Sequence, residues 1–265
     1  MRSSVRWTIV LTFIFHFLAP IPLKAEVTSD TTRMKLEKTI TGNISPKSVR
    51  ASKTGVVSAH NMMYRHSVTT YDATSLELLS TISDQVNLTE LGFKGFTGLH
   101  RGAPVEGAYS PDGAYLYVTN YAMYGKGFNR EGTDVCKPSD NYDRSFLYRI
   151  DTSTWKIDKA YRVGVVPKVV EVTPDNKYVL VSNWCSYDLT VISIETQKVM
   201  RTIKIGAYPR GITVSRDSQF AYVAQMGGAV IHKSISQHGR KSCSILAQIR
   251  ERLFSPLIIQ CSMPL

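Results

Sequence analysis

The chain has 265 residues, of which 43% are hydrophobic and 20% are charged. This is ordinary globular composition, so it excludes an intrinsically disordered or collagen-like chain. The 14 Tyr residues accompany 17 Gly and 11 Pro. This mixture favours strands joined by turns, because aromatic residues suit pleated surfaces while Gly and Pro mark the turns between them.

The net charge of +11 would by itself point to nucleic acid or another anionic partner. The excess is spread unevenly: residues 1–25 carry +3, residues 229–265 carry +4, and the segment between them holds 24 basic and 20 acidic residues. In that segment the basic residues are interspersed with acidic ones and form no stripe, which is typical of solvated surface. We therefore expect no nucleic-acid partner.

Residues 1–25 have the pattern of a secretory signal peptide. Arg2 and Arg6 precede an apolar run over 7–18, which is shorter than the roughly 20 residues of a membrane-spanning helix. The pattern predicts cleavage after Ala25 and hence an exported protein, periplasmic, cell-surface or secreted, with no membrane span after cleavage. An uncleaved anchor is the alternative, because Leu23 is the third residue back from the predicted cleavage site, where a small residue is usual.

A unit of about 40 residues recurs along the chain and begins each time with a proline. Its copies begin at Pro46, Pro104, Pro167 and Pro209. The first three copies each contain four short apolar runs joined by turn residues, as four antiparallel strands require. Four strands in a unit of this length is the pattern of a β-propeller blade. We predict an all-β fold with three complete blades and a partial one over 209–225.

The clearest motif lies in the second copy, where Tyr-Val-Thr-Asn at 117–120 follows Ser-Pro-Asp-Gly-Ala-Tyr-Leu. The third copy has Leu-Val-Ser-Asn at 180–183 in the same place. These residues resemble the YVTN family of β-propeller repeat proteins, and the resemblance extends over residues 34–228. The resemblance implies the fold but leaves function open, because propellers serve as enzymes, scaffolds and adhesion modules.

Two insertions interrupt the blades, at 83–103 and 121–144. Cys136 lies in the second insertion, and Cys185 lies in the equivalent short loop of the next blade, so both emerge on the same face. Export would place them in an oxidising compartment, where pairing is permitted. We predict a Cys136–Cys185 disulfide that holds the long loop over the mouth of the central channel; two unpaired thiols are the alternative.

The repeat pattern stops at about residue 228, so we expect blades over 26–228 and an irregular tail over 229–265. Cys243 and Cys261 lie in this tail and are assigned no role. One account is a reading frame shifted or cut short near residue 228, relative to longer relatives with about seven blades. The other is a clasped ring of four blades, in which a leading strand at 34–41 completes the last blade and 229–234 is its third strand.

Propeller sites commonly form where loops converge at one mouth of the channel. The residues that we expect on this face follow the second strands or the repeat prolines: Asn61, Tyr64, Arg65, His66, Asn120, Tyr121, Tyr124, Lys168, Asn183, Trp184, Tyr187 and Arg210. Lys47 follows a repeat proline as Lys168 and Arg210 do. The predicted partner is a protein, a peptide or a small polar ligand. Alternatively, the Asn residues end strands by bonding their own backbone, the rings fill gaps between blades, and the cations are solvated.

No metal, cofactor or catalytic residue is predicted. His60, His66 and His100 have no spacing of a ligand set, and the sequence has no nucleophile elbow, zinc-protease motif or phosphate loop. Glu106 or Glu171 would act as an acid or base only if burial raised its pKa. Glu171 is better explained as a strand residue paired with a lysine or arginine.

These patterns together predict an exported β-propeller that binds or scaffolds at the cell envelope through a loop face. One alternative is a propeller enzyme of the lactonase or quinone-dependent dehydrogenase type. The other is a non-functional truncated fragment of a longer propeller.

Overall fold

The computed structural model of the protein describes residues 35–228, 230–235 and 245–248. The chain divides into two compact units, residues 1–39 and residues 40–265. In the first unit, residues 35–39 are exposed and have no regular secondary structure. The predicted signal peptide lies outside the described residues.

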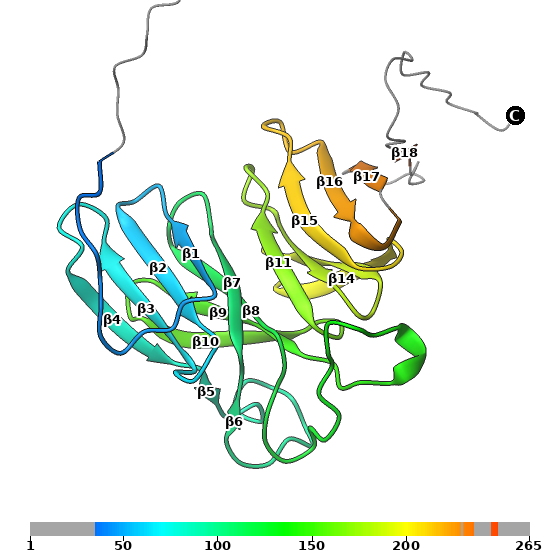
Figure 1. Ribbon diagram of the computed structural model, residues 1–265. Helices are drawn as coiled ribbons and strands as arrows, with labels where there is room; N and C mark the ends of the chain where they lie inside the picture. The colour runs from blue at the N-terminus through cyan, green and yellow to red at the C-terminus, as the bar shows by residue number, and fades with distance from the viewer. Residues whose placement is uncertain (1–34, 229, 236–244, 249–265) are drawn as a thin grey trace, which may run out of the picture. The chain divides into compact units, whose positions relative to one another are not determined.

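The second unit contains four four-stranded antiparallel sheets and a two-stranded hairpin (Figure 1). The first blade consists of β1 (Ser48–Ala51), β2 (Val56–Asn61), β3 (Ser67–Asp72) and β4 (Leu78–Ser83). The second consists of β7 (Pro104–Tyr109), β8 (Tyr115–Asn120), β9 (Phe146–Asp151) and β10 (Lys156–Arg162). The third consists of β11 (Pro167–Val172), β12 (Tyr178–Asn183), β13 (Asp188–Ser193) and β14 (Lys198–Lys204). The fourth consists of β15 (Pro209–Val214), β16 (Phe220–Gln225), β17 (Val230–Ile235) and β18 (Ile245–Gln248).

The all-β propeller fold and its three complete blades are confirmed, but the fourth blade has two strands more than the repeat predicted. β17 pairs with β16, and β18 pairs with β17, so parts of the expected irregular tail are strands. Backbone groups along the otherwise free edge of β16 attract a further strand even where the turn residues of the repeat are missing. The clasped-ring alternative is met in part: β17 overlaps its third strand at 229–234, but residues 35–41 form no leading strand.

The first strands of successive blades lie next to one another, since β7 contacts both β1 and β11, and β11 contacts β15 (Figure 1). An ion pair joins two of these strands across the second blade. Arg50 of β1 lies 2.6 Å from the carboxylate of Glu171 on β11. The prediction that Glu171 is a paired strand residue is therefore confirmed.

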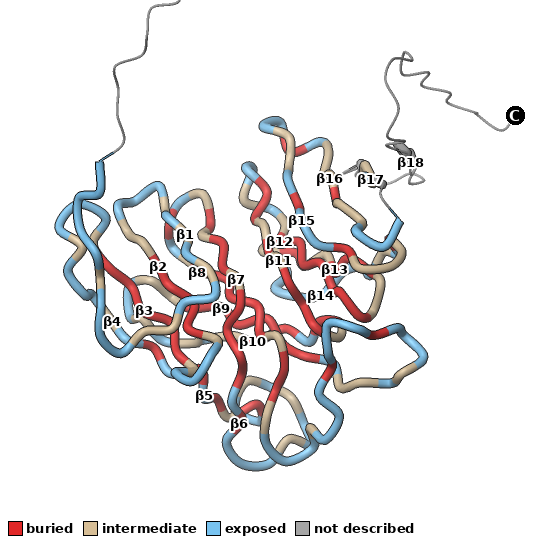
Figure 2. The backbone as a smooth tube through the Cα atoms, in the orientation of Figure 1, coloured by how far each residue is buried: buried red, intermediate tan, exposed pale blue. Residues whose placement is uncertain are grey.

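Neighbouring blades pack through apolar side chains on their second strands. Tyr117 and Val118 of the Tyr-Val-Thr-Asn run are both fully buried. Tyr117 packs with Val170 and Val179 of the third blade, whereas Val118 packs with Val68 of the first. Successive strand residues point to opposite faces, so the motif is apolar at both positions because both faces of the blade are covered. Figure 2 shows the buried residues gathered on the strands of the first three blades.

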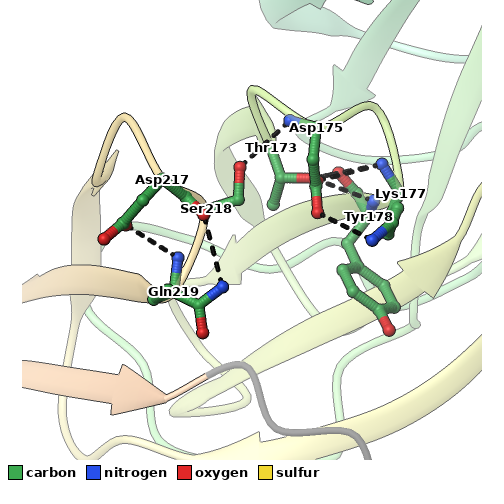
Figure 3. A network of polar contacts seen from close by, with 7 residues as sticks. All are labelled: Thr173, Asp175, Lys177, Tyr178, Asp217, Ser218 and Gln219. Atoms are coloured by element: carbon green, nitrogen blue, oxygen red, sulfur yellow. Dashed lines mark hydrogen bonds and ion pairs between the residues drawn. The ribbon is translucent and has the colours of Figure 1, made fainter.

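The turns between first and second strands also join the blades. The Asn176 side chain donates to Asp112 of the second blade at 2.9 Å. The backbone N–H of Asp175 donates to the Ser218 hydroxyl of the fourth blade at 3.0 Å (Figure 3). Gly113 and Asn176 have positive φ angles of 75° and 58°, which is the turn geometry that Gly and Asn tolerate. These turns lie where the repeat predicted them.

The first insertion folds back onto the second blade and forms a small hairpin, β5 (Gln85–Val86) and β6 (His100–Arg101). Its Leu88 is fully buried and packs in one cluster with Phe146 and Tyr148 of β9. The insertion is therefore part of the packed structure around the second blade.

A buried histidine lies at the interface between the first two blades. His60 on β2 is fully buried, and its Nδ1 lies 2.8 Å from the Ser48 hydroxyl. A Cβ atom added to Gly107 on β7 would lie 2.2 Å from His60 Nε2, so only glycine allows this approach. Burial lowers the pKa of His60 to about 3, which keeps the ring neutral.

Replacing Gly107 by alanine tests this contact. We expect Gly107→Ala to reduce the free energy of unfolding by about 1–3 kcal/mol, because the new methyl group overpacks a rigid buried ring. Gly211→Ala on β15 is the matched control, since its Cβ would meet only the Cβ of Ala224 on β16, at 3.8 Å. Denaturant unfolding would measure both, and equal stability of the two variants would contradict the assigned contact.

Acid stability tests the state of His60. The ring of His60 titrates near pH 6.5 in the unfolded chain and near pH 3 in the folded protein. Below pH 6.5 the unfolded chain therefore binds a proton that the folded protein does not, so the free energy of unfolding falls as the pH drops toward 3. We expect a loss of about 3 kcal/mol between pH 7 and pH 4 from this residue. His60→Ser introduces the residue that β12 carries at the equivalent place, Ser182. Its stability should fall less over this range; parallel pH curves for variant and wild type would refute the prediction.

Candidate functional site

Five side chains from the third blade, the fourth blade and the second insertion meet at the end of the blades where the predicted loops emerge. We call them the mouth cluster: Tyr121, Asp134, Lys168, Trp184 and Arg210. Lys168 Nζ lies 2.6 Å from Asp134 Oδ1, and the Tyr121 hydroxyl donates to the same oxygen at 3.2 Å. Lys168 Nζ also lies 4.5 Å from the Tyr121 ring centre and 5.3 Å from that of Trp184. The Arg210 guanidinium carbon is 6.0 Å from the Trp184 ring centre.

The repeat positions the two cations. Lys168 and Arg210 each follow the first residue of a first strand, at a shift in the strand pairing, and such irregularities re-aim side chains. Their backbone carbonyls accept hydrogen bonds from hydroxyls of the preceding blade, Thr119 at 3.3 Å for Lys168 and Ser182 at 2.8 Å for Arg210. The Thr of the Tyr-Val-Thr-Asn run therefore holds the strand that presents Lys168.

The cluster places a buried ammonium under an exposed carboxylate. The side chain of Lys168 is 8% exposed, whereas that of Asp134 is 71% exposed. Burial lowers the pKa of Lys168, as do Arg210 and Lys47 to a smaller degree, and Asp134 opposes the shift. The hydrogen bond from Lys168 lowers the pKa of Asp134. The three cations predicted from the repeat prolines thus act on one another.

A second carboxyl group lies among these cations. Burial raises the pKa of Glu106 on β7, while the Ser48 side chain and the charges of Arg210, Arg50 and Lys47 act in the opposite direction. The channel side of the first strands is therefore rich in cations. It also holds one partly buried carboxyl whose pKa is shifted in the direction that a general acid requires.

The predicted Cys136–Cys185 disulfide is present, with 5.5 Å between the Cα atoms. Two further contacts fix the same loop on the third blade. Trp184 Nε1 donates to the Asp134 carbonyl at 2.9 Å, and the Tyr187 hydroxyl donates to the Cys136 carbonyl at 2.7 Å. The backbone is therefore anchored at Asp134 itself and two residues later at Cys136.

Sequence reasoning missed Asp134 and Tyr208. Asp134 lies two residues before the paired Cys136, and that proximity was the available signal. The Tyr208 ring lies 4.7 Å from Trp184 and 5.4 Å from Tyr187, centre to centre. Tyr208 immediately precedes a repeat proline, where the other copies showed no aromatic residue.

The three predicted Asn residues lie in the interior. Asn61, Asn120 and Asn183 each end a second strand and are fully buried. Asn61 accepts from the Ser45 backbone, Asn120 donates to the Phe146 carbonyl, and Asn183 accepts from the Gly164 backbone. They are strand-end residues with internal partners, which places them outside the exposed part of the loop face.

His66 and Tyr124 form a second group beside the mouth cluster. His66 Nδ1 lies 3.1 Å from Asp84 Oδ2 and 2.9 Å from the Gly102 carbonyl, and its ring meets Tyr124 edge to face at 5.8 Å. Burial raises the pKa of Asp84 to about 6, against the effect of His66. The pKa of Tyr121 is raised by burial first, then by Asp134, and to a lesser degree by Tyr124. Tyr121 is therefore the member of the mouth cluster on which Tyr124 acts.

The remaining predicted residues of this loop, Tyr64 and Arg65, are exposed. His100 is buried, with its Nε2 3.0 Å from the Lys126 carbonyl. Within residues 35–228, 230–235 and 245–248, no group of three or more His, Cys, Asp or Glu side chains is placed to hold a metal ion. In the same part of the chain, no helix has the length and apolarity needed to cross a membrane.

Comparison with known proteins agrees with this architecture. Residues 138–219 match the family model described as YNCE-like beta-propeller. Over 88 residues the chain is 31% identical to Antigen Lp49 of Leptospira interrogans serogroup Icterohaemorrhagiae serovar copenhageni (strain Fiocruz L1-130). This match covers 32% of the chain and 17% of the antigen.

Among solved structures, the fold is similar to Kuenenia stuttgartiensis hydrazine synthase, with a TM-score of 0.54 and 19% identity. The alignment covers 81% of this chain and 53% of that one, so this chain spans about half of that length. At this identity the likeness shows the fold alone. The four sheets and the two fold comparisons define a β-propeller protein. Together with the repeat motif, they support a YVTN-like β-propeller protein.

Removing the disulfide should destabilise both the fold and the mouth cluster. The bond closes a segment of 49 residues, for which the loss of chain entropy in the unfolded state predicts about 4 kcal/mol. Denaturant unfolding of the Cys136→Ser/Cys185→Ser double variant should show a loss of about 2–4 kcal/mol against oxidised wild type. Wild type treated with reductant is the control and should behave like the variant. Unchanged stability of both would contradict the prediction.

Proposed function

We propose that this protein is an exported β-propeller that binds a partner through its loop face at the cell envelope. The partner is a protein, a peptide or a small polar ligand, and the mouth cluster is its principal contact. The sheets supply a rigid support, and the loops that vary from blade to blade supply the contacts.

The observation that carries this proposal is the gathering of cations and aromatic rings in one fixed group. Lys168 and Trp184 of the third blade meet Arg210 of the fourth beside a loop tied down by a disulfide. Aromatic residues and arginine are enriched among the residues that dominate binding energy. A surface that is already ordered loses less conformational entropy when a ligand binds. These features support a binding surface.

The disulfide also supports export, because such bonds form and persist mainly in oxidising compartments. The signal-peptide pattern of residues 1–25 points the same way. Export would present the loop face to partners outside the cytoplasm.

A displayed peptide library tests the proposal. Peptides selected on wild type should lose about 10-fold or more in affinity on Trp184→Ala and on Arg210→Gln, because these side chains lie in the mouth cluster. Leu99→Ala is the matched control, because Leu99 is 61% exposed and lies in the other insertion. This variant should bind the selected peptides as wild type does. Affinities can be compared by calorimetry on variants whose thermal midpoints match.

Two outcomes would count against this function. Selected peptides that bind all three variants equally would remove the mouth cluster from binding. Turnover of a sugar lactone by wild type, lost in Glu106→Gln, would favour the enzyme alternative, because Glu106 is the partly buried carboxyl on the channel side.

A further inference from the structure

We propose that the mouth cluster is a site for the carboxylate group of a ligand, and that Asp134 fills this site with a carboxylate of the protein's own. The inference rests on the proposed function and names the chemistry of the ligand. An incoming carboxylate would replace the Asp134 side chain on Lys168 and Tyr121.

The first support is the direction of the donors. The Lys168 ammonium and the Tyr121 hydroxyl converge on one oxygen, Asp134 Oδ1, at 2.6 and 3.2 Å. An ammonium and a hydroxyl aimed at one point form the charge-assisted arrangement that holds carboxylates. Among the described residues, Asp134 is the only acidic side chain that accepts a hydrogen bond from Lys168.

The second support is access. The Lys168 side chain is 8% exposed and that of Asp134 is 71% exposed, so the ammonium is shielded while the carboxylate bound to it faces solvent. The backbone of the loop stays fixed through the Trp184 hydrogen bond and the disulfide. Exchange therefore needs rotation of one exposed side chain, a fast motion for such residues, and no opening of the loop.

The third support is the balance of charge. Lys47, Lys168 and Arg210 are close enough for the outer two to lower the pKa of the central one. Asp134 and Glu106 together supply at most two negative charges against these three cations. The local excess of positive charge attracts an anionic ligand even while Asp134 is in place.

Acetate binding to Asp134→Ala tests the inference without any knowledge of the natural ligand. The signal to follow is the Trp184 indole N–H, which donates to the Asp134 backbone carbonyl and is assigned with Trp184→Phe. At constant ionic strength, Asp134→Ala should bind acetate at least about 10-fold more tightly than wild type, because the competing side chain is gone. Adding Lys168→Gln to that variant should abolish the gain.

Matched controls separate a carboxylate site from a general effect of charge. Glu195→Ala makes the same change in net charge at an exposed turn of the third blade and should bind acetate as weakly as wild type. Acetamide has the shape of acetate without its charge and should not bind. If Asp134→Ala does not fold, Asp134→Asn keeps the size of the side chain and carries the same prediction.

Equal acetate affinity in wild type and Asp134→Ala would overturn the inference. So would phosphate or chloride binding to Asp134→Ala as tightly as acetate, because the site would then accept anions of any shape. The result is independent of the peptide experiment. Selected peptides that depend on Trp184 while acetate shows no difference would leave the proposed function intact and refute the carboxylate site.

Discussion

The structure depends on the burial of blade faces by neighbouring blades. Tyr117 and Val118 show the constraint, since adjacent residues of one strand pack into different blade interfaces. A single sheet of this kind has no hydrophobic interior of its own, so each blade is stable only against the next. The Asp112–Asn176 hydrogen bond between turns adds a polar link at the opposite end from the mouth cluster.

Rigid contact between blades is also what places the mouth cluster. The hydroxyls of Thr119 and Ser182 donate to the carbonyls of Lys168 and Arg210 in the next blade, so the residues that join blades also position the two cations. In the first blade, His60 occupies the position of Thr119 and Ser182 and has no hydroxyl. There the Ser48 hydroxyl donates to the carbonyl of Val105, which follows the repeat proline of the second blade. The same positions of the repeat therefore both join neighbouring blades and orient the cations of the loop face.

The second insertion completes the site because it is tied to a different blade from the one that carries it. The disulfide and the Trp184 hydrogen bond hold Asp134 above Lys168. Without this loop, a largely buried ammonium would lack its carboxylate partner, which is costly in a poorly solvated place. The attachment of the loop to the third blade thus contributes to the stability of the charged Lys168 side chain.

The sequence by itself determined the blades, their turns and the disulfide, because apolar alternation, Asp-Gly turns and equivalent loop positions are local or periodic signals. It raised β17 only within an alternative and did not reveal β18, because the pairing of both depends on the free edge of β16 and not on repeat residues. It also placed Asn61, Asn120 and Asn183 on the binding face, although the fold buries them. Only the tertiary structure decided that Asp134 meets Lys168, because the two are 34 residues apart and are brought together by a covalent link between blades.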